Sequence, residues 1–338
     1  MKVYLLPQEG QFYKANLHCH SDYSDGRLSP AEMKAAYQEK GFSVVAFTDH
    51  DILIAHQELT DETFLALNGY EMEITEHTEG DLCHGRCCHI CLIALEPDNL
   101  KQVCWNGAEY LFANALKHMD EVQFYEDDAH YERVYSPECL NDMMKRGRDH
   151  GFFVTYNHPT WSGEGYPEYM QYKYMHAMEM WNAGNIYAGW NDYNPRVYED
   201  MLRGGKRLYC VGSDDCHSMA ALGDAWTMIK AEKLEYRTIT KAMEAGSFYA
   251  STGPEIRDLW VEDGVIHVEC SKASKIMFSY SDRRVQITRA NPDSFVEEAS
   301  AKIYPLADYV RVTIEDAEGK RAESNAYFLD ELRKSGAL

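Results

Sequence analysis

The sequence contains no run of about 20 apolar residues, which is the length that a membrane-spanning helix requires. Residues 1–7 also lack an apolar stretch of the kind found in a secretory signal peptide. Neither an internal repeat nor a low-complexity segment stands out in the 338 residues. We therefore expect a cytoplasmic globular protein that is not inserted in a membrane. A chain of this length can hold one large core and a smaller second domain.

Positive charge is scarce, because 33 Lys and Arg residues stand against 55 Asp and Glu residues, which gives a formal net charge of -22. Such a balance repels the phosphate backbone, so a long nucleic acid is not an expected partner. A small anionic substrate is compatible with it, since bound cations can reverse the potential inside a pocket.

The sequence has ten cysteines but no second CxxC pair at zinc-finger spacing. Four of them, Cys83, Cys87, Cys88 and Cys91, crowd one stretch, and the others are scattered. In a chain of this length without an export signal, we expect reduced thiols rather than disulfides. A small zinc knot at the four crowded cysteines is the alternative.

Strand-like and helix-like segments alternate over the first two thirds of the chain. Ser29 and Pro30 form a helix start, and Gly41 follows as a stop. Repeated units of this kind predict a parallel sheet with right-handed crossovers, and about seven of them predict a closed or nearly closed barrel. The expected strands include residues 12–18, 43–48, 89–95, 152–156, 177–181 and 207–212, and the expected helices are 30–40, 136–150, 194–203 and 234–245.

The pattern changes at about Gly253, where short alternating segments follow one another between turn signals such as Asp263-Gly264. They predict a small antiparallel β-sandwich. We therefore divide the chain into a barrel domain over residues 1–252 and a β-sandwich domain over 253–338. The aromatic and acidic stretch at about 96–135 is interpreted as a helical insertion over the pocket. The short alternating segments after Gly253 include 259–262, 265–269, 276–279 and 309–315.

Histidines and carboxylates stand where the apolar strands stop or start. His18 and His20 are two residues apart, so both imidazoles point to one face of a strand and can reach one ion. Burying so many titratable groups without ions would be costly, whereas divalent ions pair with carboxylates and neutral imidazoles. The further candidates are Asp25, His50, Glu71, Glu73, His89, His158, Asp215 and His217.

These residues lie in motifs that resemble, in order, those of the PHP (polymerase and histidinol phosphatase) family, over about residues 12–217. The motifs are NLHCHSDYSDG, AFTDHD, GYE, a histidine before an apolar strand, NHP and SDDCH. The tail, GSFYASTGPEI before a small β domain, resembles the stand-alone PHP phosphoesterases of the CehA/McbA-like branch. The resemblance implies a distorted (β/α)7 TIM-like barrel with two or three divalent metal ions.

The resemblance also implies how the ions are shared. Many family members have a histidine where this chain has Asp25, and the oxygen-rich site leaves zinc, iron and manganese all open. Glu71 fits the Gly-x-Glu pattern through Gly69, and Glu73 on the same strand face is an alternative bridge. The implied ligands are His18, His20 and Asp215 for a first ion, Glu71 as a bridge to a second, His89 and His158 for the second, and Asp25, His50 and His217 for the third.

The function that this site predicts is hydrolysis of a small-molecule phosphomonoester, nucleotides included. A hydroxide that bridges two ions is a strong nucleophile near neutral pH. The leaving group would take its proton from His217 or His50, where that histidine is not fully engaged with metal, or from a water at the third site. Hydrolysis of a carboxylic ester, amide or carbamate by the same site is an alternative. A non-catalytic metal-binding scaffold is a further one.

Several residues near the motifs have two interpretations. Arg27 and Arg86 contact substrate phosphate or are solvated surface charges. Asp49 and Asp214 cap turns or accept a hydrogen bond from a ligand imidazole. The aromatic residues that stack a base or only pack the barrel are Trp161, Trp181 and Tyr187.

Overall fold

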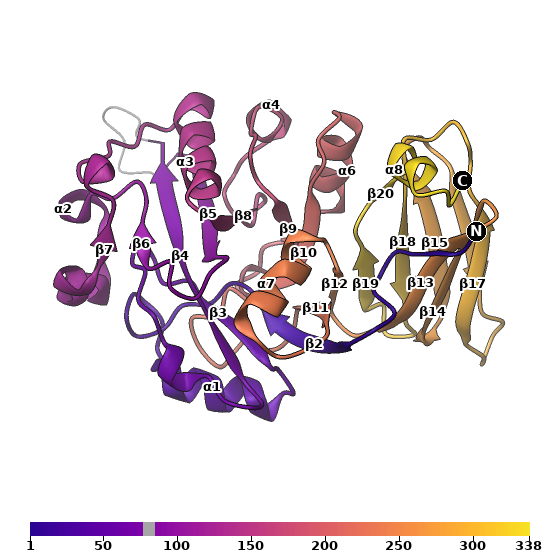
Figure 1. Cartoon of the computed structure of the whole chain (residues 1–338), viewed down its shortest axis with the longest axis horizontal. Coiled ribbons are helices and arrows are strands. Elements are labelled where there is room, and N and C mark those ends of the chain that lie inside the picture. Colours follow the sequence, from indigo (N-terminus) through magenta and orange to yellow (C-terminus); the bar gives the residue numbers. More distant parts are fainter. Residues whose placement is uncertain (77–84) are drawn as a thin grey trace.

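One mixed sheet of 14 strands runs through the computed structural model, which describes residues 1–76 and 85–338 (Figure 1). The fold is therefore mixed α/β, built on a large mixed sheet. In the order of pairing, its first strands are β10 (Tyr209–Ser213), β9 (Ala177–Asn182), β8 (Phe152–Tyr156), β5 (Cys87–Ala94), β4 (Leu65–Thr75), β3 (Val44–Phe47), β2 (Gln11–Asn16), β11 (Trp226–Ala231) and β12 (Phe248–Ser251).

Six of these nine strands lie close to where the sequence predicted them, and β4, β11 and β12 were not predicted. The strand directions differ from those of a parallel barrel. β5 pairs antiparallel with both β4 and β8, and β11 pairs antiparallel with β2. The first strand of this order, β10, meets β11 at Gly212 and Thr227. The Thr227 hydroxyl accepts from the amide of Gly212 (3.1 Å) and donates to its carbonyl oxygen (2.9 Å). No backbone ladder closes the sheet within the described residues, so the predicted (β/α)7 barrel is not confirmed.

Helices pack beside the strands that they follow or precede. Ser29 caps the first helix and forms a reciprocal capping box with Glu32, as the sequence predicted for Ser29. The third helix packs against β8 and β5, the sixth against β9 and the seventh against β11. The helices and 3-10 turns of this part are α1 (Pro30–Glu39), η1 (Gln57–Leu59), α3 (Pro137–Asp149), α4 (Tyr166–Tyr169), α5 (Ala183–Tyr187), α6 (Pro195–Arg203) and α7 (Tyr236–Glu244).

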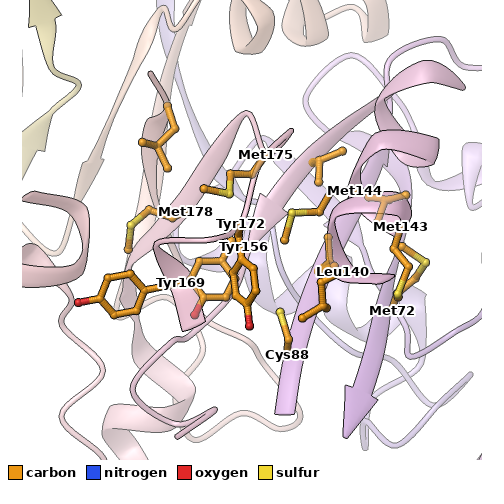
Figure 2. Close-up of a cluster of buried hydrophobic side chains, with 14 of the residues drawn as sticks. Met72, Cys88, Leu140, Met143, Met144, Tyr156, Tyr169, Tyr172, Met175 and Met178 are labelled. Atoms are coloured by element: carbon orange, nitrogen blue, oxygen red, sulfur yellow. The ribbon is translucent and has the colours of Figure 1, made fainter. Parts of the chain in front are cut away.

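A methionine- and tyrosine-rich core lies between α3 and the strands β5, β8 and β9. Figure 2 shows Met143 and Met144 of α3 in the same cluster as Tyr156 and Tyr172. The tyrosine hydroxyls donate to the buried carboxylate of Glu164: Tyr156 at 2.5 Å, Tyr135 at 2.7 Å and Tyr172 as well. Burial raises the pKa of Glu164. This packing anchors the end of β8 and the loop that follows it.

The stretch that we predicted as a helical insertion is only partly helical. It has a two-strand ladder, one short α-helix and two 3-10 turns. The buried ion pair between Arg133 and Asp51 (2.6 Å) ties the end of the stretch to the turn after β3. Its elements are β6 (Lys101–Gln102), α2 (Gly107–Tyr110), η2 (Ala113–Glu121), β7 (Gln123–Phe124) and η3 (Glu126–Asp128).

The C-terminal strands divide between two sheets with an apolar core between them. β19 (Arg321–Ser324) pairs with β12, so part of this region continues the large sheet. β1 (Val3–Tyr4) joins the second sheet, and both chain ends lie at this side of the molecule (Figure 1). The topology therefore does not confirm a separate β-sandwich, and the boundary at 252/253 stays a prediction. The large sheet continues with β18 (Tyr309–Glu315), β15 (Lys275–Tyr280), β16 (Val285–Arg289) and β20 (Tyr327–Phe328), the second sheet holds β13 (Ile256–Glu262), β14 (Val265–Ala273) and β17 (Val296–Lys302), and α8 (Leu329–Lys334) follows.

A buried ion network joins these strands to α6. Arg311 on β18 donates to Glu199 on α6 (2.7 Å) and to Glu323 on β19 (2.8 Å). Tyr193, which precedes α6, also donates to Glu323 (2.7 Å). The network thus links the C-terminal region to the segment between β9 and α6.

No helix of the described residues is both long and apolar enough to cross a membrane.

Replacing Arg311 by methionine is expected to lower the free energy of unfolding by about 3–5 kcal/mol, because the buried carboxylate of Glu323 loses the only cation that it pairs with among the described residues. The matched control is Arg257→Met. Arg257 and Glu297 form an exposed pair at 3.5 Å, for which a loss of less than about 1 kcal/mol is expected. Urea unfolding of both variants measures the difference, and equal losses would contradict the assignment.

Candidate metal centre

All nine predicted metal ligands converge at one end of the strands that carry them. Seven of them line a cavity of about 460 Å³, and His18 and His20 lie beneath it with relative exposures of 1%. The antiparallel direction of β5 explains why a strand start takes part. His89 near the start of β5 lies opposite Glu73 near the end of β4. The seven are Asp25, His50, Glu71, His89, His158, Asp215 and His217.

His18 and His20 form the floor of the site. β2 ends at Asn16, and Cys19 between the two histidines forms a parallel bridge with Cys216, which sets the SDDCH turn beside the NLHCH segment. The Nε2 atoms of His18 and His20 are 3.1 Å apart. Oδ1 of Asp215 lies 3.3 Å from the first and 3.1 Å from the second. These three side chains can therefore donate to one ion.

Glu71 occupies the centre of the cluster. Its exposure is 1%, and Asn157 donates to its Oε1 at 2.6 Å. Glu73, two residues further along β4, lies at the edge with Oε2 3.6 Å from His89 Nε2. The geometry favours Glu71 over Glu73 as a bridge. Glu71 oxygens lie 3.2 to 3.4 Å from a ring nitrogen of each of five histidines, His18, His20, His50, His89 and His158.

Asp25 gathers the ligands at the mouth. Its Oδ2 lies 3.3 Å from His217 Nε2 and 3.9 Å from His50 Nε2. The ring of His20 stacks between the other two, 4.3 Å from His50 and 4.2 Å from His217. His20 therefore belongs to this group as well as to the group with His18, whereas the resemblance assigned it to the first ion alone.

Two ligands have unusual backbone conformations. Asp215 has φ +50° and His158 has φ +24°, in the left-handed region that non-glycine residues rarely adopt. The backbone also packs tightly there. A Cβ on Gly184 would lie 2.6 Å from the carbonyl oxygen of Asp214, so only glycine lets α5 approach this turn.

The side chains fit a set of divalent ions. The ring nitrogens His20 Nδ1, His50 Nδ1 and His89 Nδ1, and the carboxylate oxygen Asp215 Oδ1, are buried without a hydrogen-bond partner. Among the described residues, no Lys or Arg forms an ion pair with Glu71 or Asp215. Buried acceptors and charges of this kind are costly unless cations compensate them. Imidazole and carboxylate together suit zinc, manganese and iron.

The buried carboxylates and imidazoles of the site shift one another's pKa values. Burial raises the pKa of Glu71, but the imidazoles of His18 and His89 outweigh it and hold that pKa well below its usual range. Burial lowers the pKa of His20, but the carboxylates of Asp215 and Glu71 outweigh it and raise that pKa to about 10. The pKa of His50 stays well below its usual range, because burial and the neighbouring His20 both lower it.

Glu179 on β9 is a site residue that the sequence analysis missed. It is fully buried, and its Oε1 lies 2.7 Å from His18 Nδ1. Its Oε2 accepts from the backbone amide of His158 (2.8 Å) and from Asn182 (2.9 Å). Such a carboxylate orients an imidazole and raises its basicity toward a metal. The available signal was an acidic residue inside the otherwise apolar strand AMEMW.

Replacing Glu179 by glutamine is expected to weaken metal affinity by about 10- to 100-fold, because His18 loses its charged partner. Metal retention during titration with a chelator measures the effect. Glu164→Gln is the matched control, since Glu164 is also buried but accepts from tyrosine hydroxyls. Equal retention by wild type and Glu179→Gln would contradict the role of Glu179.

The two aspartates beside the ligands shape turns. Asp49 accepts from the amide and hydroxyl of Ser21, both at 2.7 Å, and from Ser24 at 2.7 Å, which orders the turn that leads to Asp25. Asp214 accepts from the amides of Gly223 (2.8 Å) and Ala225 (3.2 Å). Neither forms a hydrogen bond to an imidazole in the described part of the chain.

Arg27, Arg86 and most of the crowded cysteines do not take part in the candidate metal site. Arg86 pairs with Glu76 (2.7 Å) and with Glu168, and neither Arg86 nor Arg27 lines the cavity. Of the four crowded cysteines, Cys83 lies outside the described residues. Cys88 and Cys91 point to opposite faces of β5, and only Cys91 lies in a group that could hold an ion. The described residues therefore do not form the alternative zinc knot.

The aromatic residues divide in the same way. Trp161 and Tyr187 line the cavity, whereas Trp181 packs against Tyr193 with ring centroids 4.2 Å apart. Phe112 also lines the cavity and lies 5.1 Å from the His50 ring. The sequence analysis missed Phe112, which lies in the stretch at about 96–135, where no clear periodicity predicts which side chains face the cavity.

The fold and this cluster define a mixed α/β protein with a candidate multinuclear metal centre. The model of the PHP domain matches residues 16–154, which include six of the nine predicted ligands. Over these residues the chain is similar to the PHP domain, and the match supports a metal-dependent hydrolase. No curated protein matches the sequence.

Solved structures with similar folds share little sequence with this chain. A two-domain protein from Bacteroides vulgatus that contains a predicted PHP-like metal-dependent phosphoesterase is 15% identical, with 95% of this chain and 98% of that chain covered and a TM-score of 0.45. An amidohydrolase from Chromobacterium violaceum is 16% identical (60% and 87% covered, TM-score 0.37). A lesion-specific endonuclease from Pyrococcus furiosus is 13% identical (69% and 56% covered, TM-score 0.39). No function is transferred from them, and the CehA/McbA-like branch stays a prediction.

Proposed function

We propose that this protein is a metal-dependent phosphoesterase that hydrolyses a small-molecule phosphomonoester with two or three divalent ions. One observation carries the proposal. Nine imidazole and carboxylate side chains converge on one cavity, four of their nitrogen and oxygen atoms are buried without partners, and no Lys or Arg lines the described cavity. The PHP domain match supports phosphoester hydrolysis.

Three overlapping groups would hold the ions. Bound divalent ions would lower the pKa of water and neutralise the charge that develops on phosphoryl oxygens. The sum of the reaction adds water across the P–O bond, so phosphorus gains an oxygen and the leaving alkoxide gains a proton. The groups are His18, His20 and Asp215, then His50, Glu71 and His89 with His158 beside Glu71, and finally His20, Asp25, His50 and His217.

His217 is better placed than His50 to move the proton of the leaving group. Its side chain is 39% exposed and lines the cavity, whereas that of His50 is 7% exposed. Nδ1 of His217 lies 3.0 Å from the carbonyl oxygen of Asp215, which can only accept, so Nδ1 carries the hydrogen. Nε2 is then the atom that faces Asp25. It would exchange the proton when only the first two groups hold ions, because it is also the ligand atom that His217 offers to the third group.

The test is turnover of a phosphomonoester panel by metal-stripped and refilled protein. His20→Ala and Asp215→Ala are expected to abolish the metal-dependent activity. His267→Ala is the matched control, because His267 stacks on Trp260 in the C-terminal sheet, and its activity is expected to be unchanged. Unchanged turnover by His20→Ala would contradict the proposal.

Hydrolysis of a carboxylic ester, amide or carbamate is a second candidate. The absence of Lys and Arg from the described cavity lining favours it, since such a wall does not require a charged substrate. Aryl esters and carbamates assayed beside the phosphomonoesters discriminate between the candidates. A kcat/KM that is higher for these neutral substrates would replace the first proposal with the second.

A further inference from the structure

We propose that the substrate carries one anionic group, which meets the metal centre, and that the rest of it is an uncharged aromatic alcohol. This inference rests on the proposed function and names its substrate class. The cavity of about 460 Å³ has the size of a small-molecule site. Two features of its wall carry the inference, namely its charge and its aromatic side chains.

The wall beyond the metal ligands is acidic. No Lys or Arg lines it within the described residues, and the carboxylate of Glu73 is 35% exposed on the cavity side. A second phosphate or carboxylate on the substrate would therefore meet like charge without a counter-ion, in a chain whose formal net charge is -22.

Two arginines near the cavity, Arg133 and Arg86, are paired with other carboxylates. Arg133 is 2% exposed and paired with the buried Asp51, and its guanidinium lies 4.0 Å from the Tyr110 ring centroid. Arg86 is paired with Glu76 and Glu168. Recruiting either arginine to a second anion would leave a carboxylate without its cation, which for Asp51 is a buried carboxylate.

Three separate segments each contribute one aromatic ring to the wall. Trp161 is held in place by packing against two ligands, with ring centroids 4.9 Å from His158 and 5.1 Å from His89. Its backbone amide donates to the buried carboxylate of Asp192 at 3.2 Å. Phe112 comes from the stretch before η2, and Tyr187 on α5 is 68% exposed.

Small residues complete this wall. Gly184 and Ala188 lie on the side of α5, and Ala220 and Ala221 lie on the loop after the SDDCH turn. Aromatic rings beside small residues leave room for a flat apolar group, and stacking of such a group on aromatic side chains is favourable. An aliphatic polyol would find few hydrogen-bond partners on this wall beyond the side chains of Asn185 and Ser218.

Binding of phosphonates, which are not hydrolysed, tests this inference without turnover. Calorimetry on metal-loaded protein would compare benzylphosphonate, ethylphosphonate and (4-carboxybenzyl)phosphonate. We expect benzylphosphonate to bind at least about ten-fold tighter than each of the others, because it alone combines one anion with an uncharged ring. Equal or tighter binding of the carboxybenzyl compound would overturn the inference.

Two variants assign the effect to the wall. Glu73→Gln is expected to narrow the gap between the benzyl and carboxybenzyl compounds, and Tyr187→Ala is expected to narrow the gap between benzyl and ethyl by about 3- to 10-fold. Glu62→Gln and Tyr166→Ala are matched controls, since both residues are exposed and neither lines the cavity. Equal effects of a variant and its control would overturn the assignment.

Turnover of the matching phosphate esters separates this inference from the proposed function. Benzyl, ethyl and 4-carboxybenzyl phosphates all release a primary alcohol as the leaving group. Differences between their rates therefore report binding rather than leaving-group chemistry. Hydrolysis of all three at similar kcat/KM would overturn the inference and leave the proposed function intact. The expected order of phosphonate affinities without hydrolysis of any ester would overturn the proposed function alone.

Discussion

Replacing Glu71 by glutamine is expected to lower kcat/KM by at least about 1000-fold, which corresponds to roughly 4 kcal/mol of transition-state stabilisation. Both oxygens of Glu71 lie within 3.4 Å of histidine ring nitrogens from opposite sides of the cluster. Glutamine keeps the size of the side chain but removes its charge and one acceptor. Ions on either side would then lose the ligand that they share.

Glu73→Gln is the informative comparison, because Glu73 lies on the same face of β4 at the edge of the site. We expect its loss of kcat/KM on a singly charged substrate to be at least about ten-fold smaller than that of Glu71→Gln. Metal content measured on both variants shows whether the loss follows the ions. A larger loss in Glu73→Gln would make Glu73 the bridge instead.

Removal of the metals is expected to destabilise the protein strongly. Each ion that binds only the folded chain stabilises it by about 4 kcal/mol when its free concentration is 1000 times its Kd. The ligands come from six strand ends between residues 18 and 217, so the unfolded chain does not present them together. Urea unfolding with and without a chelator measures the difference. A difference below about 1 kcal/mol would contradict a site with two or more ions.

The stabilisation by metal should also increase with pH. In the metal-free protein the carboxylates raise the pKa of His20 to about 10 and that of His18 well above its usual range, although burial opposes both. A histidine whose pKa is raised in the folded protein stabilises the metal-free fold. This stabilisation is fully present below the pKa of the unfolded chain, about 6.5, and is lost as pH rises through the pKa of the folded protein. Metal must displace these protons, so it gains about 1.4 kcal/mol per pH unit for each proton displaced.

Melting temperatures measured with and without chelator at pH 6, 7 and 8 test the sign. The difference between the two curves is expected to widen from pH 6 to pH 8. A difference that narrows with pH would contradict displacement of protons from the imidazoles.

The sequence predicted which side chains would lie together, because same-face spacing is a local property. His18 and His20, or Asp215 and His217, need only an extended backbone to point the same way. The direction of β5 was not predictable in this way. An apolar run looks the same in parallel and antiparallel sheets, so the hairpin of β4 and β5 replaced an expected parallel pair.

Contacts between residues far apart in the chain could not be predicted from the sequence either. Glu179 meets His18 across 161 residues, and Phe112 reaches the cavity from a stretch of 3-10 turns without clear periodicity. In the C-terminal region the predicted segments correspond to β13, β14, β15 and β18, whereas β16, β17, β19 and β20 were not predicted. The pairing of β12 with β19, which merges this region with the large sheet, has no local sequence pattern.

Metal content per chain tests the central claim most directly. Elemental analysis of the purified protein, refilled with zinc, manganese or iron after stripping, should give two or three ions per chain for wild type. The same analysis of His20→Ala should give at least one ion fewer, since His20 belongs to two of the groups. Wild-type protein that retains no ion with any of the three metals would contradict the account.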